Sequence, residues 1–428
     1  MMPDNKIISF SEFINSLQSA KHQHFLASEE VGISNETEFT RMKSYLVRHY
    51  EGVEALNSFV DENGSIFDCM PIEKQPSVRR NGQSVAKPPD FPVKETKNAS
   101  DEHRYSTAVS SPMNANLKDR FGNALNCPPN TVPIRRITLD DMTRFGSLEN
   151  FFQKGGVRYG RTPNAMRSII AEVPMKYFHH HAIAEQQVDN LGGHSSLNVW
   201  TPPIDEQLGQ VFSLSQQWYV GLGPPLQTFE VGWQVYPNLY NGLNPVLFVG
   251  YTADAYRNFC YNQSCTSFVV TGNKSLLGGA IVPSSIQGGI QKSLEVSVLL
   301  HQGNWWVYVG GFEVSNIIGY LPTSTYAGGP MASCANKIQY GGETCVANRE
   351  TNYPNMGSGL FANAGWQNAA YQKDIYYISL NGQTTDPSLT TLVNSQCYTS
   401  TVARSDDPNW ADTVWFGGPG GDCPGGMS

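Results

Sequence analysis

The chain has 428 residues, a formal net charge of −8 and only 15% charged residues, whereas an average soluble protein has about 25%. The chain has no excess of basic residues that could bind phosphate groups, which argues against nucleic acid or an anionic membrane as its main partner. No apolar run is long enough to span a membrane. The length predicts two or three domains, and 40 glycines with 20 Tyr and 20 Phe favour a β-rich protein with many turns.

The first part of the chain, residues 1–76, is predicted to be helical and to end in a hairpin. Ser9 to Glu12 form a capping-box pattern at the start of one helix, and Asn35 begins a second. Apolar residues after Asn35 recur at helical spacing. Asn63-Gly64 lies between two apolar pairs, which predicts a tight hairpin turn.

The composition then changes twice. Residues 77–118 are rich in Pro, Ser, Lys and Asn, which predicts a flexible linker that is open to proteolysis. Residues 119–176 separate this linker from the remainder. Residues 177–428 consist of short alternating runs divided by Gly, Pro and Asn, and they predict an antiparallel β-sandwich or barrel.

Two glutamates occupy unusual positions in these strands. Side chains alternate between faces of a strand, so Glu230, Gly232 and Gln234 share one face, opposite an apolar face that includes Trp233. In the second strand Gln339, Gly341 and Glu343 share a face. Each strand thus presents a carboxylate and an amide around a glycine, which leaves room for a ligand backbone.

A pair of glutamates can hydrolyse a bond with water. One carboxylate takes a proton from water, and the other, protonated, donates a hydrogen bond to the scissile carbonyl. Like charges held close together share a proton, so this chemistry favours acid pH. Gln234 and Gln339 would supply further amide donors. The alternative is that both glutamates are simply solvated, because most charged side chains are exposed.

The eight cysteines suit disulfide bonds and an oxidising compartment. Their number is even, two pairs are close in sequence (Cys260/Cys265 and Cys334/Cys345), and no C-x-x-C spacing suggests a zinc site. Eight unrelated buried thiols are the alternative, and connectivity does not follow from sequence. The first residues, MMPDNKIISFSEFINSL, lack the regions of a signal peptide. Trimming of the signal, another export route or release by lysis are left open.

Other groups of residues give weaker indications of function. His179, His180 and His181, with His194 nearby, invite a metal site, but H-E-x-x-H is absent and no metal is expected. No G-x-S-x-G, phosphate loop or dinucleotide fingerprint occurs, so no cofactor is expected. Trp305 and Trp306 face opposite ways, so at least one is predicted to be core rather than a carbohydrate platform. Sequons begin at Asn35, Asn98, Asn262 and Asn273.

Several stretches resemble a known family. FEVGWQVYPNLY (229–240) and IQYGGE (338–343) resemble the two signature stretches of the neprosin family of glutamic peptidases. HHAIA (180–184), FSLSQQW (212–218), CYNQSC (260–265) and FGGPGG (416–421) also fit. FDCMPIEKQP (67–76) and CPPNTVPIRR (127–136) resemble the family's activation region. The resemblance spans residues 60 to 423 or so.

This resemblance implies a β-sandwich of two antiparallel sheets preceded by a removable, loop-rich α+β propeptide that inhibits its own enzyme. Residues 119–176 are then the end of the propeptide, its activation segment. The resemblance places the catalytic pair at Glu230 and Glu343. We expect the neighbouring Gln234, Gln339, Trp233 and Tyr340 to bind the substrate, and Gln339 and Tyr340 stand where family members often have Glu-Trp. The implied activity is a secreted, monomeric, acid-acting endopeptidase that cleaves polypeptides after proline. The implied disulfides are Cys260–Cys265 and Cys397–Cys423, with Cys334–Cys345 as an addition and Cys69–Cys127 within the propeptide.

Two rival functions follow from the same residues. A glycoside hydrolase also uses paired carboxylates, and their separation carries mechanistic meaning. A non-catalytic β-sandwich that binds protein or glycan would present the same polar face without turnover.

Overall fold

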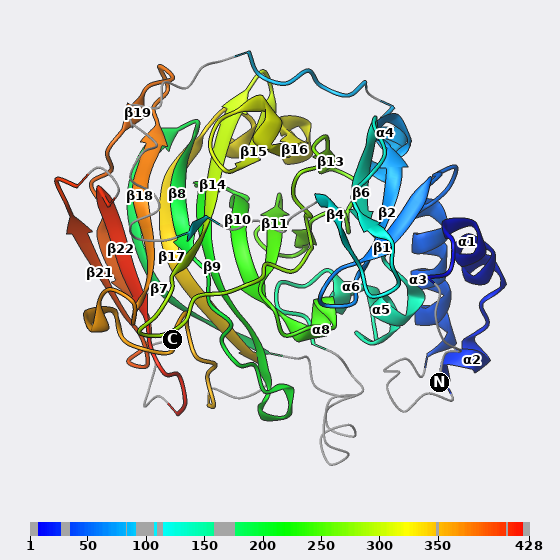
Figure 1. Ribbon diagram of the computed structural model, residues 1–428, viewed down its shortest axis with the longest axis horizontal. Coiled ribbons are helices and arrows are strands. Elements are labelled where there is room, and N and C mark those ends of the chain that lie inside the picture. The colour runs from blue at the N-terminus through cyan, green and yellow to red at the C-terminus, as the bar shows by residue number, and fades with distance from the viewer. Residues whose placement is uncertain are drawn as a thin grey trace.

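The protein, described here from a computed structural model, is built around two stacked sheets (Figure 1). The structure describes residues 7–26, 35–82, 84–90, 107–108, 114–157, 176–347, 351–407 and 410–422. The predicted antiparallel β-sandwich with a smaller helical and loop-rich N-terminal part is confirmed. Helices α1 to α3 lie at one end of the molecule, to the right in Figure 1, the small elements β1, β2, β6 and α4 to α6 lie next to them, and the two large sheets occupy the centre and left.

The first large sheet has seven strands among the described residues, and all its pairings are antiparallel. In spatial order these are β12 (Cys260–Tyr261), β11 (Val246–Thr252), β10 (Gln227–Val235), β9 (Gln210–Gly221), β17 (Ala335–Ala347), β7 (Tyr177–Asn190) and β20 (Thr390–Val393). The two candidate glutamates lie on β10 and β17, with β9 between them.

The second large sheet has ten strands in the described part of the chain. Its main path is β13 (Val269–Val270), β16 (Ile317–Pro322), β15 (Asn304–Val309), β14 (Lys292–His301), β8 (Gly192–Asn198), β18 (Ala370–Ile378), β22 (Asp412–Gly417) and β21 (Thr399–Arg404). β19 (Thr384–Thr385) pairs with β18, and β3 (Thr107–Ala108) pairs in parallel with β14.

The core between the sheets follows from strand alternation. On β10, Phe229, Val231 and Trp233 are fully buried and join one hydrophobic cluster with Val296 and Val298 of β14. Burial of such side chains contributes roughly 1.5–3 kcal/mol each. The other face of β10, which carries Glu230, therefore points away from the partner sheet.

The N-terminal part has its own small elements. Its helices are α1 (Phe10–Ser19), α2 (His22–Leu26), α3 (Glu36–His49), α4 (Pro76–Asn81), α5 (Leu139–Thr143) and α6 (Leu148–Phe151). Its strands form a sheet of β1 (Asn57–Val60), β2 (Ile66–Pro71) and β6 (Thr131–Arg135), and a pair of β4 (Asn114–Lys118) and β5 (Ala124–Leu125). Short helical turns occur at Pro237–Tyr240 (α8), Ile72–Lys74, Glu206–Leu208, Val314–Asn316, Thr323–Tyr326, Pro330–Ala332 and Ala362–Ala364.

Local sequence signals explain these starts and turns. Ser9 and Glu12 form the predicted capping box of α1, and Asn35 caps α3 by accepting from the Thr37 amide. The hairpin between β1 and β2 turns at Gly64, whose φ of 82° is accessible to glycine without strain. A fully buried ion pair of Arg136 and Asp68 at 2.5 Å ties β2 to the chain after β6.

Of the four predicted cysteine pairs, two are confirmed and one is wrong. Cys69–Cys127 and Cys260–Cys265 are disulfides. Cys397 is also disulfide-bonded, and its predicted partner Cys423 lies outside the described residues. The predicted Cys334–Cys345 bridge is wrong, because both are free thiols. Cys334 precedes β17 and Cys345 lies within it, so the extended strand separates them by roughly 35 Å, far more than a disulfide spans.

Candidate active site

The pairing of three strands brings the two glutamates to one face of the seven-stranded sheet. Glu230 on β10 lies opposite Trp218 of β9, and Glu343 on β17 lies opposite Leu214 of β9. Gln216 lies between these two rows, opposite Gly232 on one side and Gly341 on the other. The glutamates therefore face each other diagonally across β9, separated by a polar position.

The glycine beside Glu230 is required by close packing. A Cβ atom at Gly232 would lie 2.1 Å from the carbonyl oxygen of Ser215 and 2.8 Å from Cβ of Gln216. A larger residue would push β9 away from β10 and displace Gln216. The glycine thus permits the close approach that the sequence pattern indicates.

A lysine from the N-terminal part of the chain occupies the space between the carboxylates. Lys154 Nζ lies 2.8 Å from Glu230 Oε2 and 2.9 Å from Glu343 Oε2. Lys154 is only 5% exposed, Glu343 is 1% exposed and Glu230 is fully buried. Burial alone would lower the pKa of Lys154, but the two carboxylates raise it overall, so the lysine is a cation.

Glu230 is surrounded by neutral donors besides this lysine. Its Oε1 accepts from Thr228 Oγ1 at 2.9 Å and from the Tyr256 hydroxyl at 2.7 Å. Its Oε2 accepts from Gln216 Nε2 at 2.7 Å. Burial, followed by the neighbouring Glu230 charge, raises the pKa of Tyr256, so the phenol stays protonated and donates.

Glu343 is instead flanked by two histidines of β7. His179 Nδ1 lies 2.7 Å from Glu343 Oε1, and His181 Nε2 lies 3.7 Å from Oε2. Burial alone would raise the pKa of Glu343, but Lys154, His181 and His179 lower it overall, so the carboxylate is ionised. Burial also works against charge on His179, but contacts with Cys345 and Glu343 raise its pKa to about 10. For His181 burial dominates and lowers the pKa to about 4.

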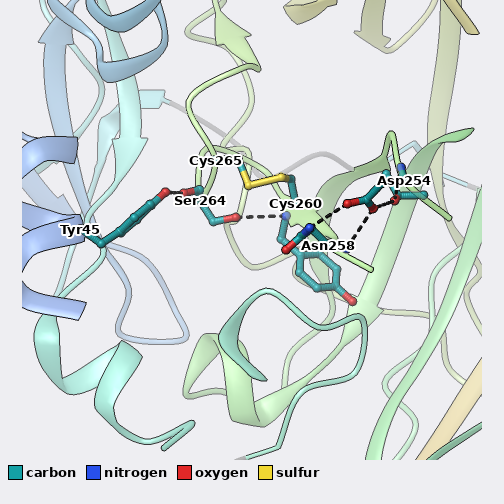
Figure 2. The surroundings of a disulfide bond; sticks show 8 residues. Tyr45, Asp254, Asn258, Cys260, Ser264 and Cys265 are labelled. Atoms are coloured by element: carbon teal, nitrogen blue, oxygen red, sulfur yellow. Dashed lines mark hydrogen bonds between the residues drawn. A yellow bond between two sulfur atoms is a disulfide. The ribbon is translucent and has the colours of Figure 1, made fainter. Parts of the chain in front are cut away.

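Tyr256 is held over Glu230 by an ordered loop between β11 and β12. Asp254 accepts hydrogen bonds from the backbone and side-chain amides of Asn258, at 3.0 and 2.7 Å, as Figure 2 shows. The Cys260–Cys265 disulfide closes the segment that directly follows this loop, and Tyr45 of α3 donates to the Ser264 carbonyl in that segment (Figure 2). The N-terminal part therefore contacts the segment next to the loop that positions a partner of Glu230.

The chain around Lys154 fills the rest of the site. We call residues 152–156 the plug. The Phe259 amide donates to the Phe152 carbonyl at 2.8 Å, and the Tyr236 hydroxyl donates to the Gly156 carbonyl. A Cβ atom at Gly155 would lie 3.0 Å from Cys345 Sγ. The plug thus contacts β17, the Tyr256 loop and the end of β10 at once.

The predicted substrate-binding residues divide into two groups. Gln234 and Gln339 lie on the same face as the glutamates, and their amides donate to the Tyr240 hydroxyl at 3.0 Å and to Glu185 Oε2 at 2.6 Å. The predictions for Trp233 and Tyr340 are wrong. Both are fully buried on the opposite face, where the Trp233 indole donates to the Asn198 carbonyl, so neither reaches the site.

Sequence reasoning missed several residues of this site. The alternation of β7 puts His179 and His181 on one face, but only the pairing of β7 with β17 places them beside Glu343. Gln216 lies within the recognised stretch FSLSQQW and Tyr256 lies outside every recognised stretch, and neither has a distinguishing pattern. Nothing in FFQKGG signals Lys154. Among the described residues, no group of three or more His, Cys, Asp or Glu is arranged to hold a metal ion.

The fold and site define a β-sandwich protein with a buried carboxylate pair covered by its own N-terminal region. A family model described as Neprosin matches residues 209–419, and one described as Neprosin activation peptide matches residues 58–185. The chain therefore belongs to the neprosin family of glutamic peptidases, and an activation peptide that contains Lys154 precedes its neprosin domain, as in a proenzyme. No helix among the described residues is long and apolar enough to cross a membrane.

Two solved structures are similar at a low level. One is scytalido-glutamic peptidase with a transition-state analogue inhibitor, with 8% sequence identity, a TM-score of 0.32, and coverage of 56% of this chain and 98% of that chain. The other is SCP-B, a member of the eqolisin family of peptidases in complex with a tripeptide, with 9% identity, a TM-score of 0.29 and the same coverage. Both TM-scores are below 0.5, so these likenesses add nothing to the assignment.

Proposed function

We propose that the chain is the precursor of an acid-acting glutamic endopeptidase in which Glu230 and Glu343 activate water and polarise the scissile carbonyl. The observation that carries this proposal is the position of Lys154. One ammonium nitrogen lies within 2.9 Å of an oxygen of each carboxylate, in a site almost closed to solvent. A water at that position, once the lysine has left, would contact both carboxylates.

The two carboxylates take different roles. Without Lys154 they are like charges held close together, so the pair retains one proton. The cationic imidazole of His179 keeps Glu343 ionised, and the proton therefore belongs on Glu230, whose other neighbours are neutral. Glu343 takes a proton from the attacking water, while Glu230 Oε2–H donates to the carbonyl oxygen. The proton on Glu343 then passes to the leaving amine.

The activation peptide inhibits the enzyme by filling this position. While Lys154 is bound, neither carboxylate can hold a water or a carbonyl. The low pKa of Glu343 and of His181 in this closed form means that both groups bind protons more weakly than in the open form. Acid therefore favours opening. For His181 the pH window runs from its ordinary value of 6.5 down to about 4.

Specificity and location follow from the family resemblance and from cysteine use. We expect cleavage after proline, which peptides that differ only in Pro or Ala at the cleaved position would test. Disulfides belong to oxidising compartments, which fits a secreted enzyme. No cofactor takes part in the proposed reaction.

The test compares acid-treated wild-type protein with Glu230→Gln and Glu343→Gln. Each variant should lower kcat/KM on polypeptides by about a thousandfold, since each removes a proton transfer. Glu295→Gln, on the other sheet, is the matched control and should keep wild-type activity. Polysaccharide is assayed in parallel. Retained peptide hydrolysis in either site variant, or hydrolysis of polysaccharide alone, would refute the proposal.

A further inference from the structure

A second contact between the activation peptide and the sandwich lies on the opposite side of the molecule from the glutamates. Trp306, Tyr308, Tyr320 and Phe312, which we call the aromatic patch, lie on or beside β15 and β16 of the ten-stranded sheet. They belong to a hydrophobic cluster separate from the core between the sheets. The patch therefore faces outward, and its cover comes from elsewhere in the chain.

Residues 84–90, Ser-Val-Ala-Lys-Pro-Pro-Asp, which we call the strap, supply part of that cover. Val85 and Ala86 pack against the cluster, and the Ala86 amide donates to the Tyr320 hydroxyl at 2.9 Å. Pro89 is buried, whereas Lys87 and Pro88 are exposed. Ala86 and Pro89 are three residues apart, which is one turn of a polyproline II helix.

Residues that precede the strap in the chain are also bound to the ten-stranded sheet. The Gln75 side chain is fully buried, and its amide donates to the Val270 carbonyl of β13 at 2.8 Å while its oxygen accepts from the Val270 amide at 2.9 Å. Val78 of α4 joins the same cluster. The precursor thus lays an extended, proline-containing peptide across the edge of the sheet and onto aromatic side chains.

The patch also offers a hydrogen-bond donor that the strap does not use. Trp306 is 1% exposed, and its indole N–H has no hydrogen-bond partner among the residues that the structure describes. Buried tryptophan N–H groups normally find an acceptor. Aromatic grooves that bind proline-rich peptides combine flat rings with such donors, because a polyproline II backbone exposes its carbonyls.

We propose that the aromatic patch is a docking site for an extended polypeptide of the pattern Ala-x-x-Pro, which the strap occupies in the precursor and vacates on maturation. In the mature protein the occupant is a proline-containing polypeptide substrate, a step that rests on the proposed peptidase function. A substrate polypeptide that binds the aromatic patch has a raised local concentration at the glutamates. Substrates long enough to reach both places are therefore cleaved at a lower KM, and short peptides are not.

The first test measures binding without catalysis. The probe is a fluorescein-labelled peptide with the strap sequence, added to full-length protein that carries Glu343→Gln, with or without Val85→Asp and Pro89→Asp to displace the strap. Fluorescence anisotropy should show at least about tenfold tighter binding to the strap-displaced chain, because the intact strap competes intramolecularly. No binding, or equal binding of a scrambled peptide, would overturn the proposal, whatever the outcome of the peptidase assays.

The second test does not depend on folding of that variant. In acid-processed protein, Tyr320→Phe removes the acceptor of the Ala86 amide and retains the ring. It should raise KM about fivefold for a polypeptide carrying the strap sequence, and leave its kcat and the KM of a short peptide unchanged. Tyr376→Phe, on β18 of the same sheet beside His194, is the matched control. Equal changes for long and short substrates would contradict substrate docking.

Discussion

The activation peptide contacts the sandwich at two places whose chemistry is opposite. At the front, one lysine is bound to two carboxylates beside two histidines, so the contact is made of titrating groups. At the back, the strap and the aromatic patch meet through apolar side chains and a neutral hydrogen bond. We therefore expect acid to weaken the front contact and to leave the back contact intact, so that opening of the site and release of the peptide would be separable steps.

The largest expected effect on stability comes from removing the buried charge of Lys154 at the front contact. Lys154→Met leaves two neighbouring buried carboxylates with His179 beside Glu343 as their remaining cationic contact among the described residues, so the free energy of unfolding of the precursor should fall by about 3 kcal/mol at pH 7. In this variant the repulsion between the two buried carboxylates is greatest when both are ionised, so acid, which lowers their charge, relieves part of the loss. In the wild type the pKa of Glu343 is low, so stability is lost as pH falls. The difference in the free energy of unfolding between the wild type and Lys154→Met should therefore be smaller at pH 5 than at pH 7.

Denaturant unfolding at several pH values measures this narrowing. Lys337→Met is the matched control, because it removes a lysine that lies 3.2 Å from Glu185 on a half-buried part of the same sheet face. The free energy of unfolding of Lys337→Met should be lower than that of the wild type by at most about 1 kcal/mol, and by the same amount at each pH. A constant difference for Lys154→Met would show that the front contact does not depend on its charges.

A smaller effect is expected at His181. Its low pKa in the closed form means that acid adds a positive charge near Lys154, which repels the lysine. His181→Gln removes this charge, so the midpoint pH of precursor processing should move down by about half a unit. His180→Gln is the control, since His180 belongs to the same triplet but packs on Tyr353, with ring centroids 4.1 Å apart. Equal shifts in both variants would remove His181 from the mechanism.

The smallest effect is expected at the back contact. Tyr320→Phe in the precursor removes one neutral hydrogen bond, to the Ala86 amide. It should lower the free energy of unfolding by about 1 kcal/mol, and by the same amount at pH 7 and pH 5. Denaturant unfolding under the conditions used for Lys154→Met measures it. A loss that grows in acid would mean that the two contacts do not differ in the way proposed.

Local sequence signals predicted the elements that depend on neighbouring residues. The capping box of α1, the cap of α3 and the β1–β2 hairpin are present as predicted. Alternation placed Glu230 and Glu343 on polar faces, and pairing with β9 brought those faces together. The same alternation put Trp233 in the core, so assigning it to substrate binding contradicted its own strand. The prediction for Tyr340 is wrong for the same reason. Tyr340 lies between Gln339 and Gly341 in the strand, so its side chain points to the face opposite theirs.

The remaining site residues depend on contacts distant in sequence. Lys154 is 76 residues from Glu230 and 189 from Glu343, and no local periodicity reports such a contact. His179 lies 164 residues from Glu343, and its role depends on the register of β7 against β17. Proximity in sequence also misled for Cys334 and Cys345, because an extended strand separates them.

The most direct measurement is the pH at which the precursor is processed with and without the lysine between the glutamates. Lys154→Met should move the midpoint pH of processing upward by about one unit or more, because the closed form loses the ion pairs that acid must otherwise break. Lys87→Met, on the exposed side of the strap, should leave the midpoint unchanged. Electrophoresis of samples incubated across the pH range reads out both. An unchanged midpoint in Lys154→Met would contradict the claim that Lys154 holds the paired glutamates closed.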